Sequence, residues 1–268
     1  MFYNARNERI DIDNTTADYI SFGKGNRNLI IIPGVGDGLK TVKGLAIPFS
    51  IMYKMFAKDF RVYVFSRRNN ISVGFSTEDM ANDIIDHMEK LNLDKADIVG
   101  VSQGGMIAQY IAINAPEKIN KLVLAVTLSK SNEILEDTVN NWIEKAKNND
   151  YKGIMIDTAE RSYTGKYLEK NRKVYRLLGL FGKNVKYERF IIQAKSCLTH
   201  NAYSKLEGIK CPTLIIGARK DKALGIEGTE EMAKQIKSSE IFVYEEYSHG
   251  VYEQAKDFNS RVLEFLKK

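Results

Sequence analysis

The feature that most constrains this chain is a serine between two glycines, at the point where an apolar run meets the start of a helical pattern. Within residues 97–105, the segment Gly100-Val101-Ser102-Gln103-Gly104 predicts a sharp turn from a strand into a helix. Such a turn holds the serine in strained backbone geometry and projects its hydroxyl group above a sheet. Glycines on either side remove Cβ atoms that would collide across the turn. With 19 glycines in the chain, this pattern needs support from its surroundings.

Short apolar and β-branched runs alternate with helical patterns along most of the chain. The expected strands cover residues 29–32, 61–66, 98–101, 122–128, 213–216 and 240–244. Ser76 and Asp79 form a capping box ahead of an amphipathic helix, another helix covers residues 106–114, and a last one starts near Phe258. The alternation predicts an α/β protein with a doubly wound, mostly parallel sheet.

The alternation stops between residues 129 and 206, which form a mainly helical pattern without a buried strand. A doubly wound sheet rarely continues for so long without returning a strand. We therefore expect a core of residues 1–128 and 207–268 with a helical cap, residues 129–206, inserted over the sheet. The alternative is that these helices continue the main layer.

The composition is that of an ordinary globular chain of 268 residues with a net charge of +6. The lysines are scattered among acidic residues, which favours a solvated surface over a nucleic-acid face. The one basic run, Ser66-Arg67-Arg68-Asn69, is expected in a loop after a strand.

Cys197 and Cys211 form neither a disulfide framework nor a metal-binding spacing. A reducing, cytoplasmic setting is therefore expected. The first residues lack the pattern of a secretion signal, and no stretch reaches the roughly 18 apolar residues of a membrane span.

A serine hydroxyl needs a base within hydrogen-bond reach, and the chain has three histidines to supply one. His87 lies on the polar side of the amphipathic helix and is expected at the surface, and His200 is expected to be structural. His249 differs, because it follows the last expected strand and so lies at the same carboxyl edge of the sheet as Ser102. Parallel α/β sheets place their functional sites at this edge.

The orienting acid should follow the preceding strand. After the strand that begins at Thr213, the candidate is Asp221. The resulting chain order is Ser102, Asp221, His249, with each residue just beyond a strand, and chance seldom supplies this arrangement. The sequence predicts a catalytic triad.

At this point the chain resembles the α/β-hydrolase superfamily over nearly its whole length. The matching segments are Leu29-Ile30-Ile31-Ile32-Pro33-Gly34, Gly100-Val101-Ser102-Gln103-Gly104-Gly105, residues 217–221, Ser248-His249-Gly250 and Ala255-Lys256-Asp257-Phe258. The family usually has His-Gly where this chain has Pro33-Gly34. The family acid often lies three residues after its glycine, whereas Asp221 lies four after Gly217.

The resemblance implies an oxyanion hole made by two backbone N–H groups. By position these belong to Val35, after Pro33-Gly34, and to Gln103, after the nucleophile. Each such bond contributes roughly 3 kcal/mol in the transition state.

The same glycine-rich loop comes close to two nucleotide-binding motifs. Residues 34–41 read Gly-Val-Gly-Asp-Gly-Leu-Lys-Thr, but both motifs need a glycine where Leu39 stands. This mismatch disfavours phosphate binding, and no metal or organic cofactor is expected.

These residues predict a serine hydrolase that cleaves a small or medium carboxylic ester through an acyl-enzyme, resembling a carboxylesterase or a monoacylglycerol lipase. The expected cap supplies aromatic and leucine side chains for an apolar roof over Ser102, unless most of them only pack the cap onto the sheet. The first candidates for substrate binding are Trp142, Tyr163, Leu178 and Phe181, and the other members of the roof are Tyr151, Tyr167, Leu177 and Leu180.

The resemblance also admits thioesterases, proline aminopeptidases, carbon–carbon bond hydrolases and cofactor-free peroxidases. Haloalkane dehalogenases are disfavoured because they carry a carboxylate where this chain has Ser102. Outside enzymes, a non-catalytic module that binds a small ligand has no need of all three triad residues, and an interaction protein with a basic surface would be indifferent to loss of Ser102. The expected partner is a small-molecule substrate, and both a monomer and a homodimer are open.

Overall fold

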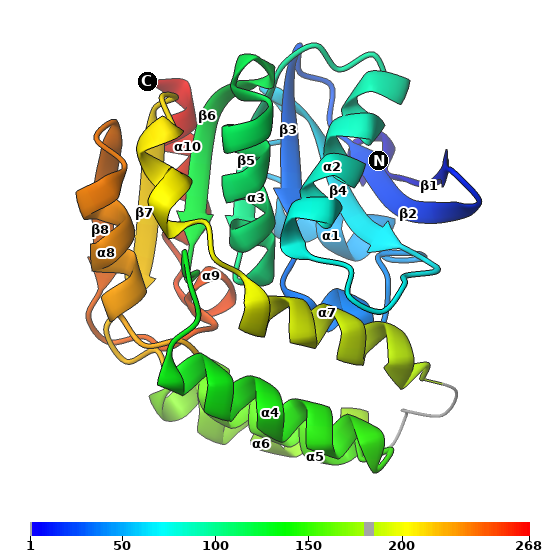
Figure 1. The fold of residues 1–268 in the computed structure, drawn as a ribbon, viewed down its shortest axis with the longest axis vertical. Coiled ribbons are helices and arrows are strands. Elements are labelled where there is room, and N and C mark those ends of the chain that lie inside the picture. Colours follow the sequence, from blue (N-terminus) through cyan, green and yellow to red (C-terminus); the bar gives the residue numbers. More distant parts are fainter. Residues whose placement is uncertain (1, 180–184) are drawn as a thin grey trace.

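The computed structural model describes residues 2–179 and 185–268, which contain a single eight-stranded sheet (Figure 1). The strands are β1 (Arg6–Ile12), β2 (Thr15–Phe22), β3 (Arg27–Ile32), β4 (Phe60–Arg68), β5 (Ala96–Val101), β6 (Ile119–Ala125), β7 (Thr213–Ala218) and β8 (Ser239–Tyr244). Their order in the sheet is β1-β2-β4-β3-β5-β6-β7-β8. β2 pairs antiparallel with both β1 and β4, and all other neighbours are parallel. The predicted α/β class with a mostly parallel sheet is confirmed.

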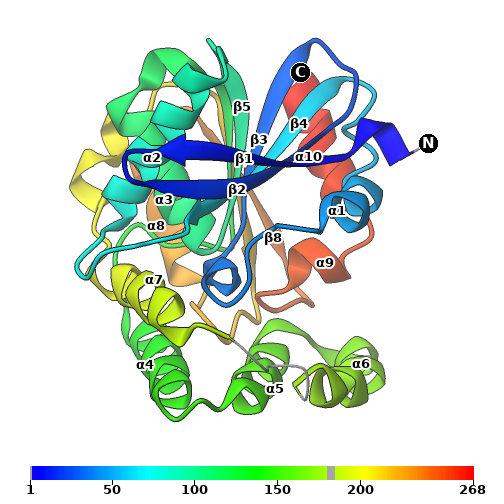
Figure 2. The same ribbon diagram turned by 90° about the vertical axis from the view of Figure 1, so that its right-hand side faces the viewer.

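Helices cover both faces of this sheet (Figure 2). They are α1 (Ala46–Met52), α2 (Thr77–Lys90), α3 (Gln103–Asn114), α8 (Glu227–Gln235), α9 (Val251–Gln254) and α10 (Phe258–Lys267). Side chains of α2, α3 and α8 share one apolar cluster with Ile30 and Ile98, whereas side chains of α1 and α10 share another with Ile31 and Val99. Neighbouring residues of one strand thus point into opposite layers, as the pleat requires.

Between β6 and β7, the described residues contain four α-helices, called here the four-helix segment: α4 (Glu133–Lys147), α5 (Tyr151–Ser162), α6 (Gly165–Leu178) and α7 (Tyr187–Thr199). They lie beyond the carboxyl ends of the parallel strands, at the bottom of Figure 1. Their apolar cluster includes Trp142 and Phe190 and continues to Met106 of α3 and to Leu128. This cluster packs α4 and α7 against the helix that follows Ser102.

The sequence patterns missed the first two strands and extended one strand too far. β1 reads Arg-Asn-Glu-Arg-Ile-Asp-Ile, and it is polar because one face of this edge strand is exposed. The strand expected over residues 122–128 ends at Ala125, since Val126 takes a positive φ of 43° that a strand does not accommodate. The predicted capping box of Ser76 and Asp79 is present at the start of α2.

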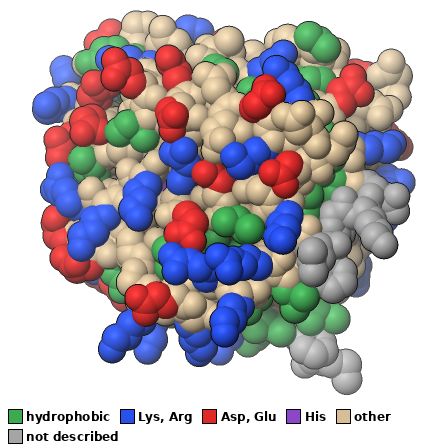
Figure 3. Space-filling model, turned by 90° about the horizontal axis from the view of Figure 1, so that it is seen from below, with side chains coloured by type: hydrophobic (Ala, Val, Ile, Leu, Met, Phe, Trp, Pro, Cys, Tyr) green, Lys and Arg blue, Asp and Glu red, His purple; other side chains and the backbone are tan. Residues whose placement is uncertain are grey.

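Charged side chains are scattered over the outer face of the four-helix segment. Figure 3 shows Lys and Arg side chains spread over this face, with Asp and Glu side chains among them. In the described part of the chain, no helix combines the length and the apolar character that crossing a membrane requires.

Candidate active site

Ser102 stands at the turn from β5 into α3 and adopts φ 55° and ψ −123°. A non-glycine residue with positive φ is strained, and strain of this kind typically costs about 1–3 kcal/mol. A Cβ atom on Gly100 would lie 2.5 Å from the carbonyl oxygen of Gly104, and one on Gly104 would overlap the Ile32 carbonyl oxygen. The two glycines are therefore required by close backbone approach, as the sequence predicted.

The structure brings the three predicted triad residues into one hydrogen-bonded row. His249 Nε2 lies 3.0 Å from Ser102 Oγ, and His249 Nδ1 lies 2.8 Å from Asp221 Oδ2. The other oxygen of Asp221 accepts hydrogen bonds from the backbone N–H groups of Ala223, at 2.8 Å, and Leu224, at 2.9 Å. Asp221 and His249 are both buried. This carboxylate orients the imidazole ring, and the ring faces the hydroxyl group.

The other two histidines are buried away from this row. His200 Nδ1 lies 2.8 Å from Thr77 Oγ1, and burial lowers the pKa of its ring to about 3. The surface position predicted for His87 is wrong, because its ring is fully buried against Phe65 and burial lowers its pKa to about 3. Helix α2 contacts β4 and also β1, a strand that the sequence patterns missed. The side of α2 that carries His87 is therefore covered as well.

The two proposed oxyanion donors lie on segments next to Ser102. A Cβ atom on Gly34 would be 3.3 Å from Ser102 Cβ, so the loop that carries Val35 runs past the nucleophile. Gln103 is the first residue of α3, where N–H groups have no acceptor within the helix. The side chain of Gln103 is buried and already bonded, which leaves its backbone N–H as the group available for an oxyanion.

A cavity of about 290 Å³ opens beside Ser102 and His249. Of the residues predicted to bind substrate, Trp142 lines this cavity, whereas Tyr163 and Leu178 do not. Tyr163 is buried behind the wall, and Leu178 is 42% exposed on α6. Phe181 and Leu180 lie outside the described residues.

Much of the cavity wall comes from residues that sequence reasoning missed. Leu45, Phe49, Met52 and Tyr53 line the cavity from α1 and its flanks. Their spacing of four, three and one residues is that of a helix face, which was the signal available in the sequence.

The cavity wall also contains the carboxyl group of Glu253, which follows His249 closely in the sequence. Burial raises the pKa of Glu253 above the usual range. Its Oε2 accepts a hydrogen bond from the hydroxyl group of Tyr163, the buried residue behind the wall. The described residues contain no group of three or more His, Cys, Asp and Glu side chains suited to a metal ion.

The family of the chain follows from this fold and from a sequence comparison. The model of the family described as alpha/beta hydrolase fold matches residues 27–256. The match spans most of the chain, including the turn at Ser102 and the loops that carry Asp221 and His249. The protein belongs to the alpha/beta hydrolase fold family.

Individual relatives are distant in sequence and close in structure. The chain is 23% identical over 256 residues to 3-oxoadipate enol-lactonase 2 of Acinetobacter baylyi, covering 94% of this chain and 93% of that protein. MGS-M2, an alpha/beta hydrolase enzyme from a deep-sea metagenome library of the Medee basin, superposes with a TM-score of 0.85 at 21% identity, over 97% and 98% of the two chains. The enol-lactonase of Burkholderia xenovorans gives 0.81 at 18% identity, over 97% and 100%. These similarities establish the fold.

Proposed function

We propose that this protein is a serine hydrolase that cleaves a small or medium carboxylic ester through an acyl-enzyme on Ser102. The observation that carries this proposal is the row of Ser102 Oγ, His249 and Asp221, with separations of 3.0 and 2.8 Å, and the position of Ser102 and His249 in the wall of the cavity. A serine is activated in this way when a base within hydrogen-bond reach is itself oriented by a third group.

In the proposed reaction, His249 Nε2 takes the proton of Ser102 as Oγ attacks the ester carbonyl carbon. The N–H groups of Val35 and Gln103 hold the negative charge that forms on the carbonyl oxygen. His249 then protonates the leaving alcohol, and the acyl group stays on Ser102. A water molecule activated by His249 releases the acid and restores the serine.

The cavity indicates the size and polarity of the substrate. About 290 Å³ is near the lower end for small-molecule pockets, and much of its wall is apolar, from residues such as Phe49, Met52 and Trp142. The burial that raises the pKa of Glu253 also penalises any other charge placed beside this carboxyl, which favours uncharged substrate groups there. The names of the lactonase relatives make cyclic esters a natural extension of the substrate series.

The test combines covalent labelling with an ester series. A fluorophosphonate probe followed by peptide mapping should label Ser102 in the wild type and leave Ser102→Ala unlabelled, and kcat should fall at least about 10⁴-fold in this variant. Among p-nitrophenyl esters from acetate to palmitate, we expect the acetate and butyrate to be hydrolysed fastest.

Two outcomes would separate the chemistry from the substrate. Labelling of Ser102 without turnover of any ester would favour another hydrolase reaction, such as thioester or amide cleavage. A folded protein that takes no label would overturn the activated serine and favour a binding module.

Both cysteines are free thiols, which agrees with the cytoplasmic setting that we propose.

A further inference from the structure

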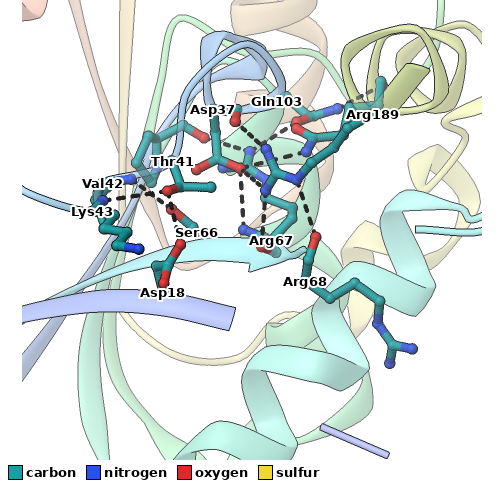
Figure 4. A network of polar contacts seen from close by, with 12 residues as sticks. Asp18, Asp37, Thr41, Val42, Lys43, Ser66, Arg67, Arg68, Gln103 and Arg189 are labelled. Carbon is teal, nitrogen blue, oxygen red and sulfur yellow. Dashed lines mark hydrogen bonds and ion pairs between the residues drawn. The ribbon is translucent and has the colours of Figure 1, made fainter. Parts of the chain in front are cut away.

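The last residues of β4 place a guanidinium group inside the protein, next to both segments of the proposed oxyanion hole. Arg67 is 2% exposed. Its Nη2 lies 2.5 Å from the carbonyl oxygen of Pro33 and 2.9 Å from Oε1 of Gln103, and it donates a hydrogen bond to each (Figure 4). One nitrogen atom therefore joins the loop that carries Val35 to the first residue of α3.

Gln103 is also held from the side of the four-helix segment. Its Nε2 donates to the backbone oxygen of Gln193, at 2.7 Å, and to Ser196 Oγ, at 3.2 Å, both on α7. The side chain is thus fixed at its oxygen by Arg67 and at its nitrogen by α7. Because both ends of the amide are bonded, the start of α3 is fixed relative to these neighbours.

A buried carboxylate holds Arg67 and the loop together. Asp37 Oδ2 accepts a hydrogen bond from the backbone N–H of Arg67, at 3.2 Å, and from Nη2 of Arg189 on α7, at 2.6 Å. Arg189 also donates to the carbonyl oxygens of Asp37 and Arg67. Burial alone would raise the pKa of Asp37, but Arg189 and Arg67 lower it below the usual value, so the carboxyl is ionised. The residues Asp37, Arg67, Gln103, Arg189 and Gln193 are called here the Arg67 cluster.

The position of Arg67 is costly for stability. Burial lowers the pKa of its guanidinium to about 10, and its Nε and Nη1 have no hydrogen-bond partner within residues 2–179 and 185–268. Buried charges that are only partly bonded contribute little to stability or reduce it. A role in holding the neighbouring segments explains the site better than a contribution to folding.

We infer that Arg67 is a positioning residue for the oxyanion hole, an inference that rests on the proposed function. The two donor N–H groups come from separate parts of the chain, and both must lie 2.7–3.1 Å from one developing oxyanion. Arg67 fixes their separation through its bonds to Pro33 and Gln103. The pair of Asp37 and Arg189 makes this arrangement depend on α7.

The chain offers a matched control in the adjacent residue. Arg68 is also largely buried, its Nε lies 2.8 Å from Asp83 Oδ2, and its guanidinium packs over the ring of Phe75. Within the described residues, the side chain of Arg68 makes no hydrogen bond to the loop that carries Val35 or to Gln103. Arg67→Met and Arg68→Met each remove one guanidinium group, but only the first should move the donors.

The measurements are kcat and KM for p-nitrophenyl butyrate, the melting temperature, and the affinity for a trifluoromethyl ketone. Ser102 Oγ adds to the carbonyl carbon of such a ketone, and the carbonyl oxygen becomes an oxyanion that the two donor N–H groups can bind. We expect Arg67→Met to lower kcat about 10- to 100-fold with KM changed less than about 3-fold, and to weaken the ketone in parallel. Arg67→Lys should recover part of the loss. Arg68→Met should lower the melting temperature and leave kcat within about 3-fold of the wild type.

Gln103→Met provides a second route to the same test if Arg67→Met does not fold. It removes the bonded amide and keeps the backbone N–H, so it should also lower kcat with little change in KM. In an active wild type that is labelled at Ser102, an unchanged kcat in Gln103→Met, or equal effects of the changes at Arg67 and Arg68, would overturn the role of Arg67. A wild type that is neither labelled nor active would overturn the proposed function itself, and the inference with it.

Discussion

Two polar clusters meet at Ser102, and they are assembled in different ways. Each member of the triad follows a different strand of the sheet, and its partners are the next triad member or nearby backbone groups. The Arg67 cluster instead joins the end of β4, the loop after β3, the start of α3 and helix α7. The comparison teaches that the side chains of the triad bond to one another and to nearby backbone, whereas the side chains that hold the proposed oxyanion donors bond directly to the four-helix segment.

The largest effect that separates the two clusters is expected from Asp221→Asn. The amide of asparagine donates to His249 Nδ1, so the ring takes the tautomer with a proton on Nε2 and cannot accept the proton of Ser102. We expect kcat to fall about 10⁴-fold with the fold intact. Kinetics on p-nitrophenyl butyrate measures this.

The control for this change is Asp257→Asn, which neutralises a half-exposed carboxylate paired with Arg261. It should leave kcat unaltered. If Asp221→Asn lost no more activity than this control, the carboxylate would have no part in orienting His249. The change at Arg67, with its expected loss of about 10- to 100-fold, follows next in size.

A change at Gly104 tests the packing that brings the two clusters together. A Cβ atom at Gly104 would overlap the backbone at Ile32 and lie 2.8 Å from the Pro33 carbonyl oxygen. Gly104→Ala should therefore move α3 away from the loop that carries Val35. We expect a loss of about 2–3 kcal/mol in the free energy of unfolding, measured by urea denaturation. Gly36 has no atom within 4 Å of the same position, and Gly36→Ala should change stability by less than about 0.5 kcal/mol. Equal losses in the two variants would contradict the close approach.

The smallest expected effect concerns a buried histidine that belongs to neither cluster. The folded pKa of His87, about 3, lies below the value of about 6.5 for an exposed histidine, so the unfolded chain takes up a proton first as the pH falls. Stability is therefore complete above about pH 6.5 and decreases between pH 6.5 and 3. Between pH 7 and pH 5 the wild type should lose about 2 kcal/mol more than His87→Leu in urea unfolding. His200 remains in both proteins, and an identical pH dependence would show that His87 is not held neutral.

The residues that follow the strand ends could be predicted from the sequence, because each is marked by a pattern of a few consecutive residues. The apolar run before Ser102, the glycines around it and the positions of Asp221 and His249 after later strands each occupy a few consecutive residues. Since parallel strands end at one edge of a sheet, these short patterns were enough to place the three residues together.

The sequence by itself determined the α/β class, the turn at Ser102 and the positions of Ser102, Asp221 and His249 just after three strands, because hydrophobic alternation and backbone approach at glycine are local effects. Only the tertiary structure decided which side chains support them. Arg67 was expected in a loop after a strand, and it is instead buried within β4, which extends to Arg68, while Arg189 and Gln193 of α7 reach the loop after β3. Leu178 was expected over the cavity, and it is exposed on α6. These positions depend on how distant elements pack, and no short segment of the chain contains that information.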